Sequence, residues 1–441
     1  MTSQASTLNS PRLQFDDSNP YAGDLFKRRE IAVQLTGYID RLRDGTVLAI
    51  DAPWGEGKSW FGLNWAADLK SQDYRVIYLD SFQQDYVEDP FLLIASEIND
   101  VIAVEDGVGD ELKHKAATVM KALLPFSTKV LLNIAGRLAL GTVDASKDLE
   151  DAIQKAGENA ADESQKWLEN KIEDHSKEKE SVENFRNALS EFCASQDKPV
   201  VFFIDELDRC RPLFAVKLIE RLKHFFDVPN LVFVLLLNRD QLEKAIKGVY
   251  GSETDASSYL GKFVHMYLRL PKRAIALGDH GNSNWNYLWK LADHYKFPRS
   301  QELEQFINCL SILASIMKLS LRDLEKCVAL LALNGVSNSA IYLAWSIALK
   351  LKHPQIFYGL LLDDINSHIQ ASELLSKMVP SEYAHFWIKD YFYPLHMIAA
   401  NCADKLSEDQ INNMKRLQPN GFYNGSPLNF WLNRIDIAIQ D

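Results

Sequence analysis

Runs of consecutive apolar residues alternate with stretches of helical period over residues 19–102 and 196–275. The runs at 47–50, 200–204 and 231–237 are apolar throughout, which is typical of strands buried on both faces of a parallel sheet. Two further strands are expected at 75–80 and 265–270. Helices are predicted at 19–43, 58–70, 90–102, 213–226 and 239–250. This order predicts an α/β fold with a parallel sheet and helices on both faces.

The rest of the chain reads as helical. Residues 103–195 are polar and charge-rich, and near their end one apolar stripe falls at i, i+3, i+7 and i+10: Val182, Phe185, Leu189, Phe192. From 284 onward no strand pattern is convincing. We therefore predict a flexible tail (1–18), an NTPase-like core (19–102 and 196–275), a helical insert (103–195) and a helical C-terminal domain (276–441), with 276–335 as sensor or lid helices.

The most apolar long stretch, 116–142, is not expected to span a membrane. Lys121, Lys129 and Arg137 interrupt it every eight residues. A spanning helix needs about 20 predominantly apolar residues, and each central cation costs about 2.5–3.5 kcal/mol. A soluble helical hairpin around Pro125 is the expectation, and a peripheral helix on anionic lipid stays open. The charged stretch 147–180 is expected to be a solvated helix, with a partner-binding coiled coil as its alternative.

Composition narrows the class of protein. With 441 residues, 47% of them hydrophobic, the chain can bury a sizeable core, and a net charge of −12 argues against a general nucleic-acid coat. Five cysteines without C-x-x-C spacing support neither a zinc site nor a disulfide framework. The polar N-terminus lacks the apolar region of a signal peptide, so a cytoplasmic protein is expected.

A phosphate-binding loop is predicted directly after the strand that ends at Asp51. Its glycines, lysine and serine match the G-x-x-x-x-G-K-[ST] pattern except that Ala52 replaces the first glycine, where a positive φ would strain it. Successive backbone N–H groups and a helix N-terminus would hold phosphate; Lys58 would reach the β- and γ-phosphates, and Ser59 would ligate Mg²⁺. The predicted nucleotide-binding residues are Ala52, Pro53, Trp54, Gly55, Glu56, Gly57, Lys58, Ser59 and Trp60.

Two acids at the end of the buried strand 200–205 supply the second half of such a site. Asp205 is expected to hold Mg²⁺, and Glu206 to orient and polarise the attacking water. Adjacent carboxylates at a buried strand end are costly unless a cation is bound nearby. Together with the loop upstream, they predict ATP hydrolysis.

Three further features carry weaker predictions. Asn238 ends the strand 231–237, where an amide can position water or the γ-phosphate, although a turn-forming asparagine fits too. Ser320 can cap a helix whose first turn holds Arg322, the place of a γ-phosphate sensor or of a plain surface arginine. Asn238-Arg239-Asp240 fails the guanine-specificity motif, which favours ATP. A solvated face is the preferred interpretation of one basic cluster, with nucleotide or nucleic-acid contact as its alternative: Lys262, His265, Arg269, Lys272, Arg273.

These strings together resemble the KAP family of P-loop NTPases, a branch of the STAND/AAA-like group. The resemblance runs over about 19–335 and rests on Pro53–Ser59, Asp80–Phe82, Ile204–Pro212, Ile219–Phe226, Asn238–Leu242 and Tyr259–Phe263. It implies ATP hydrolysis and, in bacteria, plasmid- or prophage-linked roles such as phage exclusion and defence. Members often carry membrane helices between the two nucleotide-binding motifs, and the charges in 103–195 depart from that form.

The sequence thus predicts an ATPase with ATP and Mg²⁺ as cofactors, Glu206, Lys58, Asn238 and Arg322 as catalytic residues, and Ser59 and Asp205 as metal ligands. Its output would be a conformational switch passed to a protein partner or a second copy. An ATP-binding scaffold with little turnover and a nucleic-acid-associated motor are the alternatives. No arginine finger is singled out; the candidates are Arg209, Arg211, Lys262 and Arg269.

Overall fold

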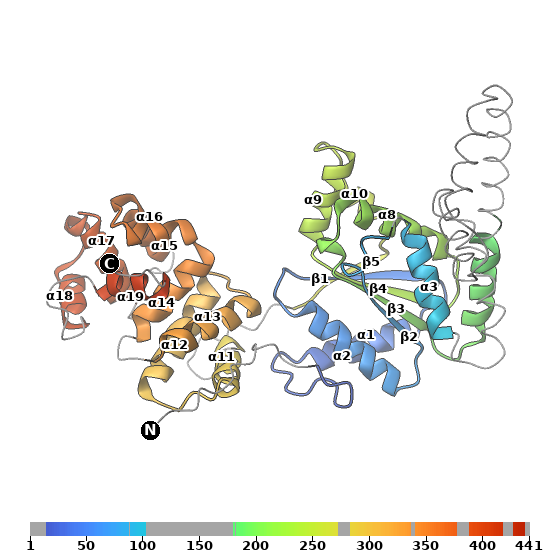
Figure 1. Ribbon diagram of the computed structural model, residues 1–441, viewed down its shortest axis with the longest axis horizontal. Coiled ribbons are helices and arrows are strands. Elements are labelled where there is room, and N and C mark those ends of the chain that lie inside the picture. The colour runs from blue at the N-terminus through green and yellow to red at the C-terminus, as the bar shows by residue number, and fades with distance from the viewer. Residues whose placement is uncertain are drawn as a thin grey trace, which may run out of the picture.

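The computed structural model of the chain describes residues 15–87, 89–102, 180, 182–271, 283–336, 340–376, 388–417 and 427–436. Figure 1 shows an α/β body and, beside it, a lobe made of helices. Most of the predicted insert 103–195, with its Lys121–Arg137 stretch, lies outside the described residues. Among the described helices, none is long and apolar enough to cross a membrane.

The α/β body is built on a five-stranded parallel sheet in the order β2-β3-β4-β1-β5. Two predicted strands have the bounds expected from the sequence, β3 and β4, because all of their residues are buried. β4 lies between β1 and β3. The strand that leads into the phosphate loop, β1, and the strand that ends at Asp205, β3, are therefore separated by one strand. The strands are β1 (Thr46–Asp51), β2 (Val76–Asp80), β3 (Val200–Asp205), β4 (Leu231–Leu237) and β5 (Met266–Arg269).

Helices cover both faces of the sheet, as the sequence predicts (Figure 1). One face packs against α1 (Arg28–Ile39) and α2 (Lys58–Ser71). The other face packs against α3 (Pro90–Ile102), α8 (Pro212–Leu222) and α9 (Arg239–Tyr250). The predicted apolar stripe joins this second core: residues 182–195 are helical, and Phe185 contacts Phe91 with ring centroids 6.2 Å apart.

Several predicted boundaries differ from the structure. The helix expected at 19–43 begins only at Arg28, because Pro20 and Gly23 fall in turns and Lys27 has the left-handed φ of 55°. The helix expected to run to Phe226 ends at Leu222 and tightens into a 3₁₀ turn, Lys223–Phe225. A short helix that the sequence analysis missed, α10 (Ala256–Leu260), begins at the Asp255 cap.

The C-terminal lobe has its own core, in which every described regular element is a helix. Leu25 and Phe26, from the segment before α1, pack against this core, so the N-terminal segment touches both parts of the molecule. The α-helices are α11 (Ser283–His294), α12 (Gln301–Ile316), α13 (Leu321–Asn334), α14 (Ala340–Lys352), α15 (Pro354–Leu361), α16 (Ile365–Ser376), α17 (Tyr393–Ala399), α18 (Glu408–Leu417) and α19 (Pro427–Asp436).

Candidate functional site

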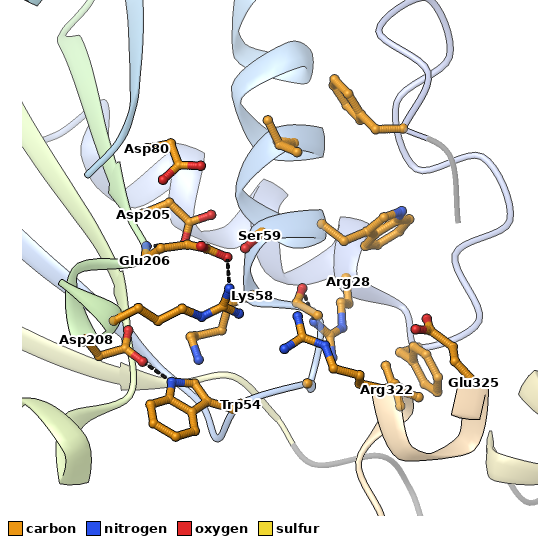
Figure 2. Close-up of a pocket in the computed structure, with 18 of the residues that line it drawn as sticks. Arg28, Trp54, Lys58, Ser59, Asp80, Asp205, Glu206, Asp208, Arg322 and Glu325 are labelled. Carbon is orange, nitrogen blue, oxygen red and sulfur yellow. Dashed lines mark hydrogen bonds and ion pairs between the residues drawn. The ribbon is translucent and has the colours of Figure 1, made fainter. Parts of the chain in front are cut away.

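A cavity of about 580 Å³ lies where the carboxyl ends of the strands meet the start of α2 and the first turn of α13. Ligands of open parallel sheets bind at this edge, and the volume falls in the range of small-molecule sites. Figure 2 shows side chains from both parts of the molecule pointing into it. Nine predicted site residues line it: Trp54, Gly55, Gly57, Lys58, Ser59, Trp60, Asp205 and Glu206 from the α/β body and Arg322 from the helical lobe. Ala52, Pro53 and Glu56 are not among its lining residues.

The loop between β1 and α2 has the backbone of a phosphate nest. Gly55 and Gly57 have φ values of 81° and 77°, a region that glycine enters without steric cost. Ala52 has a negative φ, so the strain considered for alanine at the first motif position does not arise. Lys58 begins α2, and its Nζ donates to Ala52 O at 2.7 Å. Burial lowers the pKa of Lys58, while the carboxylates of Asp208 and Asp205 oppose that shift.

Asp205 sits at the end of β3 with 3% of its surface exposed. Its carboxylate accepts hydrogen bonds from the Ser59 hydroxyl, from Tyr78 Oη at 2.8 Å and from the Glu206 N–H at 2.7 Å. Burial raises the pKa of Asp205, and these three donors oppose the rise. The two predicted metal ligands therefore contact each other directly.

Glu206 follows in a left-handed conformation, with φ 58° and ψ 22°. A non-glycine residue held in this region is strained, and such strain gathers at functional sites. Its Oε1 lies 2.7 Å from Arg209 Nη1. Burial raises the pKa of Glu206, and the Arg209 guanidinium opposes the rise.

Helix α13 of the C-terminal lobe touches the phosphate loop. Ser320 caps α13 in a capping box with Asp323, as its place in the sequence predicts. The Arg322 N–H donates to Gly55 O at 3.3 Å. A methyl group at Gly55 would lie 2.6 Å from Ser320 Oγ, so only glycine allows this close approach.

Several contacts around the cavity were not predicted from the sequence. Arg28 donates to two carbonyls of the loop, and the Trp54 indole donates to Asp208. Tyr287 Oη donates to Glu325 Oε1 at 2.8 Å on the side of the helical lobe. These residues come from five separated segments, so one sequence does not reveal that they meet. Trp54, in the predicted phosphate loop, and Asp208, in the acidic string that follows Asp205, had local signals.

Asn238 is not one of the described residues that line the cavity. It caps α9, its side chain accepting from the Gln241 N–H at 3.4 Å, which is the turn-forming alternative weighed from the sequence.

Of the four arginine-finger candidates, Arg209 lines the cavity. Arg211 pairs with Asp85, Arg269 lies 3.5 Å from Asp51, and Lys262 lies over the Tyr259 ring.

The oxygen atoms of Ser59 and Asp205 are suitable ligands for a small, hard cation such as Mg²⁺. Within the described part of the chain no group of three or more His, Cys, Asp or Glu side chains could hold a metal on its own. Mg²⁺ needs no such cage, since it commonly takes one or two protein oxygens and completes its shell with phosphate and water. Ser59 and Asp205 would supply those oxygens. Close by, Asp208 Oδ1 is buried and has no hydrogen-bond partner in the structure.

Solved structures with overall likeness include the Aeropyrum pernix ORC2 protein in its ADP form, with 10% identity, a TM-score of 0.33 and coverage of 90% of this chain and 85% of that one. The structure of the same protein with ADPNP and ADP has 11% sequence identity and a TM-score of 0.35, and the match covers 93% of this chain and 96% of that one. A DNA replication initiation factor has 10% sequence identity and a TM-score of 0.33, and the match covers 93% of this chain and 89% of that one. At these identities and TM-scores the likeness carries no conclusion about this chain.

Curated protein sequences give no match. A family model, described as the KAP family P-loop domain, matches residues 28–332. That match spans more than half of the 441 residues and includes the phosphate loop, Asp205 and Glu206 at the end of β3, and the first turn of α13. The resemblance found in the sequence is confirmed, and the chain belongs to the KAP family of P-loop NTPases, a family of nucleotide-binding domains.

Proposed function

We propose that this protein binds Mg-ATP in the cavity between β1, β3 and α13 and hydrolyses it. The observation that carries the proposal is the meeting of four side chains there. Lys58 and Ser59 come from the phosphate loop, and Asp205 and Glu206 from the end of a buried strand. Four ionisable or oxygen-donating groups at one buried edge are costly unless they serve a charged ligand.

Each residue has a role that its position supports. The N–H groups of 54–60 and the Lys58 ammonium would hold the phosphates, since Pro53 has no N–H and that of Ala52 donates to Leu237 O. Ser59 and Asp205 would ligate Mg²⁺, which supplies neutralisation of phosphate charge when bound. Glu206 would take a proton from the attacking water, for which a raised pKa is suited. Arg322 would sense the γ-phosphate, and the water-positioning role of Asn238 stays a prediction.

The output we propose is a change in how α13 meets the phosphate loop. Arg322 and Ser320 belong to the helical lobe, and both touch Gly55. A ligand that binds more tightly to one arrangement of loop and helix shifts the equilibrium toward it. The lobe would pass this change to a protein partner or to a second copy of the chain.

One observation favours the alternative of a scaffold with little turnover. The Arg209–Glu206 ion pair occupies the carboxylate that hydrolysis needs as a base. Phosphate release by the full chain with Mg-ATP, measured with and without a co-purifying protein, separates the two functions. We expect sustained release that a Glu206→Gln chain lacks; ATP binding without release under every condition would leave the scaffold.

On the family resemblance we further propose that this protein, with its partner, acts in anti-phage defence or phage exclusion. A Glu206→Gln chain, which should retain ATP, is the bait of choice for isolating that partner. Phage plating on bacteria that express the wild-type chain should be reduced relative to bacteria that express Lys58→Ala. Equal plating on the two strains across a broad phage panel would remove this role and leave the ATPase proposal standing.

A further inference from the structure

A buried arginine from outside the P-loop motif lines the cavity and donates to two carbonyls of the phosphate loop. Arg28, the first residue of α1, has 3% of its surface exposed. Its Nη2 donates to Glu56 O at 2.7 Å, and its Nη1 donates to Gly57 O at 3.0 Å. The guanidinium carbon lies 5.6 Å from the centre of the Phe26 ring, so an aromatic side chain borders it as well.

These bonds fix the direction of two peptide groups. The peptide bonds of the described residues are all trans, and in a trans peptide the C=O and N–H point to opposite sides. The peptide that carries Glu56 O also carries the Gly57 N–H, and the peptide that carries Gly57 O carries the Lys58 N–H. Because Arg28 holds both oxygens on its own side, both N–H groups turn to the opposite side.

The same loop needs this support because its glycines are free to turn. Gly55 and Gly57 both adopt positive φ, and glycine populates either sign of φ at similar cost. The Gly57 carbonyl also accepts from the Phe61 N–H of α2 at 3.0 Å, so the start of the helix helps to hold the Gly57–Lys58 peptide, and the Glu56–Gly57 peptide depends more on the bond from Arg28. The third carbonyl in the row, Gly55 O, accepts from the Arg322 N–H of α13. Two helices, α1 and α13, therefore hold three successive carbonyls.

We propose that Arg28 is a positioning residue for phosphate: it orients the Gly57 and Lys58 N–H groups toward the phosphate chain without contacting the nucleoside. This inference rests on the proposed nucleotide binding. It assigns Arg28 a contribution to the affinity for the phosphate chain alone. Figure 2 shows Arg28 beside the start of α2, on the same side as Arg322.

Lysine is a poor substitute because it has a single ammonium group, whereas a guanidinium fork reaches two acceptors at once. Arg28→Met keeps the length of the apolar stem and removes both donors. Arg29, exposed on the next position of α1, gives a matched control, Arg29→Met. Thermal melting of each variant reports whether it folds, and Arg28→Lys serves where Arg28→Met does not.

The experiment is calorimetric titration of the full chain with Mg-ATP and, separately, with Mg-tripolyphosphate, which has no nucleoside. Arg28→Met should weaken both ligands by a similar factor, about 10- to 100-fold, since two charge-assisted hydrogen bonds that set the nest are lost. Arg28→Lys should fall between, and Arg29→Met should match the wild type. Millimolar methylguanidine should restore part of the loss in Arg28→Ala and add nothing to the wild type.

Three results would overturn the inference. Loss of ATP affinity with unchanged tripolyphosphate affinity would place Arg28 on the nucleoside. Unchanged affinity for both ligands in a folded Arg28→Met chain would remove any positioning role. A wild type that binds Mg-ATP but not tripolyphosphate would show that the loop does not hold the phosphate chain by itself. A wild type that binds neither ligand contradicts the proposed nucleotide binding itself.

Discussion

The α/β body and the helical lobe bury different kinds of polar side chain. In the described part of the body, Arg28, Lys58, Asp68 and Asp205 are buried charges, and all but Asp68 line one cavity. The buried polar residues described in the lobe are asparagine, serine and histidine, which need carry no charge. Burying a charge costs far more free energy than burying a hydrogen-bonded neutral group. Buried charge therefore separates the part of this molecule built for a ligand from the part built for packing.

The lobe shows how a polar core can serve packing. The Trp345 indole donates to His396 Nε2 at 3.1 Å, so the proton of neutral His396 is on Nδ1 and faces His368 Nδ1 at 3.0 Å. His368 then carries its proton on Nε2, 3.5 Å from Asp363. Both ring nitrogens of His396 are in use, one as acceptor from Trp345 and one as donor to His368, whereas His368 Nε2 has no hydrogen-bond partner in the structure. The two hydrogen bonds of His396 hold only while both histidines are neutral.

The largest effect is expected at the phosphate loop. Lys58→Ala removes the only ammonium among the described residues that line the cavity, and with it several charge-assisted hydrogen bonds. Affinity for a fluorescent ATP analogue should fall by about 100-fold or more. Lys70→Ala, in the exposed last turn of the same helix, is the control. A folded Lys58→Ala chain with wild-type affinity would contradict the idea that the buried charges of the α/β body serve a ligand.

A smaller effect is expected where the two parts meet. Arg322→Met keeps the α13 cap and the backbone bond to Gly55 but removes the guanidinium from the cavity. Turnover of Mg-ATP should fall by about 10- to 100-fold, with less change in ADP affinity, because the guanidinium would act on the γ-phosphate. Lys326→Met, later on the same helix, should have no effect. Equal loss for ATP and ADP would place Arg322 elsewhere on the nucleotide.

Lowering the pH should destabilise the wild-type lobe more than the lobe of a chain in which His396 is replaced. Burial lowers the pKa of His396 to about 3 from its usual 6.5. Above pH 6.5 the His396 ring is neutral in both the folded and the unfolded chain. Below pH 6.5 the ring is protonated in the unfolded chain but stays neutral in the folded chain, so the free energy of unfolding decreases as the pH falls. At pH 5 the cost is about 2 kcal/mol.

Thermal melting followed by tryptophan fluorescence at pH 7 and pH 5 measures this cost. His396→Gln keeps an acceptor for Trp345, and its pH dependence should be smaller, whereas exposed His294→Gln should behave as the wild type. An identical pH dependence in the His396→Gln chain would mean that the buried ring is not the group that titrates.

The smallest effect concerns the base. Burial raises the pKa of Glu206 and the Arg209 cation opposes that rise, so Arg209→Met should raise the pKa further. A base must be ionised, so the acid limb of the kcat/KM profile should move to higher pH, by about one unit or less. Arg211→Met, which removes a neighbouring pair with Asp85, is the control. An acid limb that stays in place would assign the base to another group.

Local patterns predicted much of the body and less of the cavity. The apolar runs of β3 and β4 fixed both strands to the residue, and the glycine-lysine-serine string located the start of α2. The late start of α1 was missed because Lys27 adopts a left-handed conformation that nothing in the periodicity indicates. The roles of Arg28 and Tyr287 were missed because they depend on contacts with segments far away in the chain.

Asn238 illustrates the limit of a strand-end argument. It lies at the carboxyl end of β4, as expected, yet its side chain is engaged in capping α9. Ser320 was predicted more securely, since a capping box is a local pattern that needs no tertiary contact to form. What the sequence could not give was the meeting of that cap with Gly55, about 265 residues away along the chain.

A single-turnover experiment tests the central claim most directly. Full-length wild type and Glu206→Gln are mixed in excess over radiolabelled Mg-ATP, and bound ATP and ADP are separated after quenching. The account predicts that both chains bind ATP, that the wild type converts it to ADP, and that Glu206→Gln does so about 100-fold more slowly or worse. Cleavage by Glu206→Gln at the wild-type rate, or a wild type that holds ATP uncleaved with every partner supplied, would contradict it.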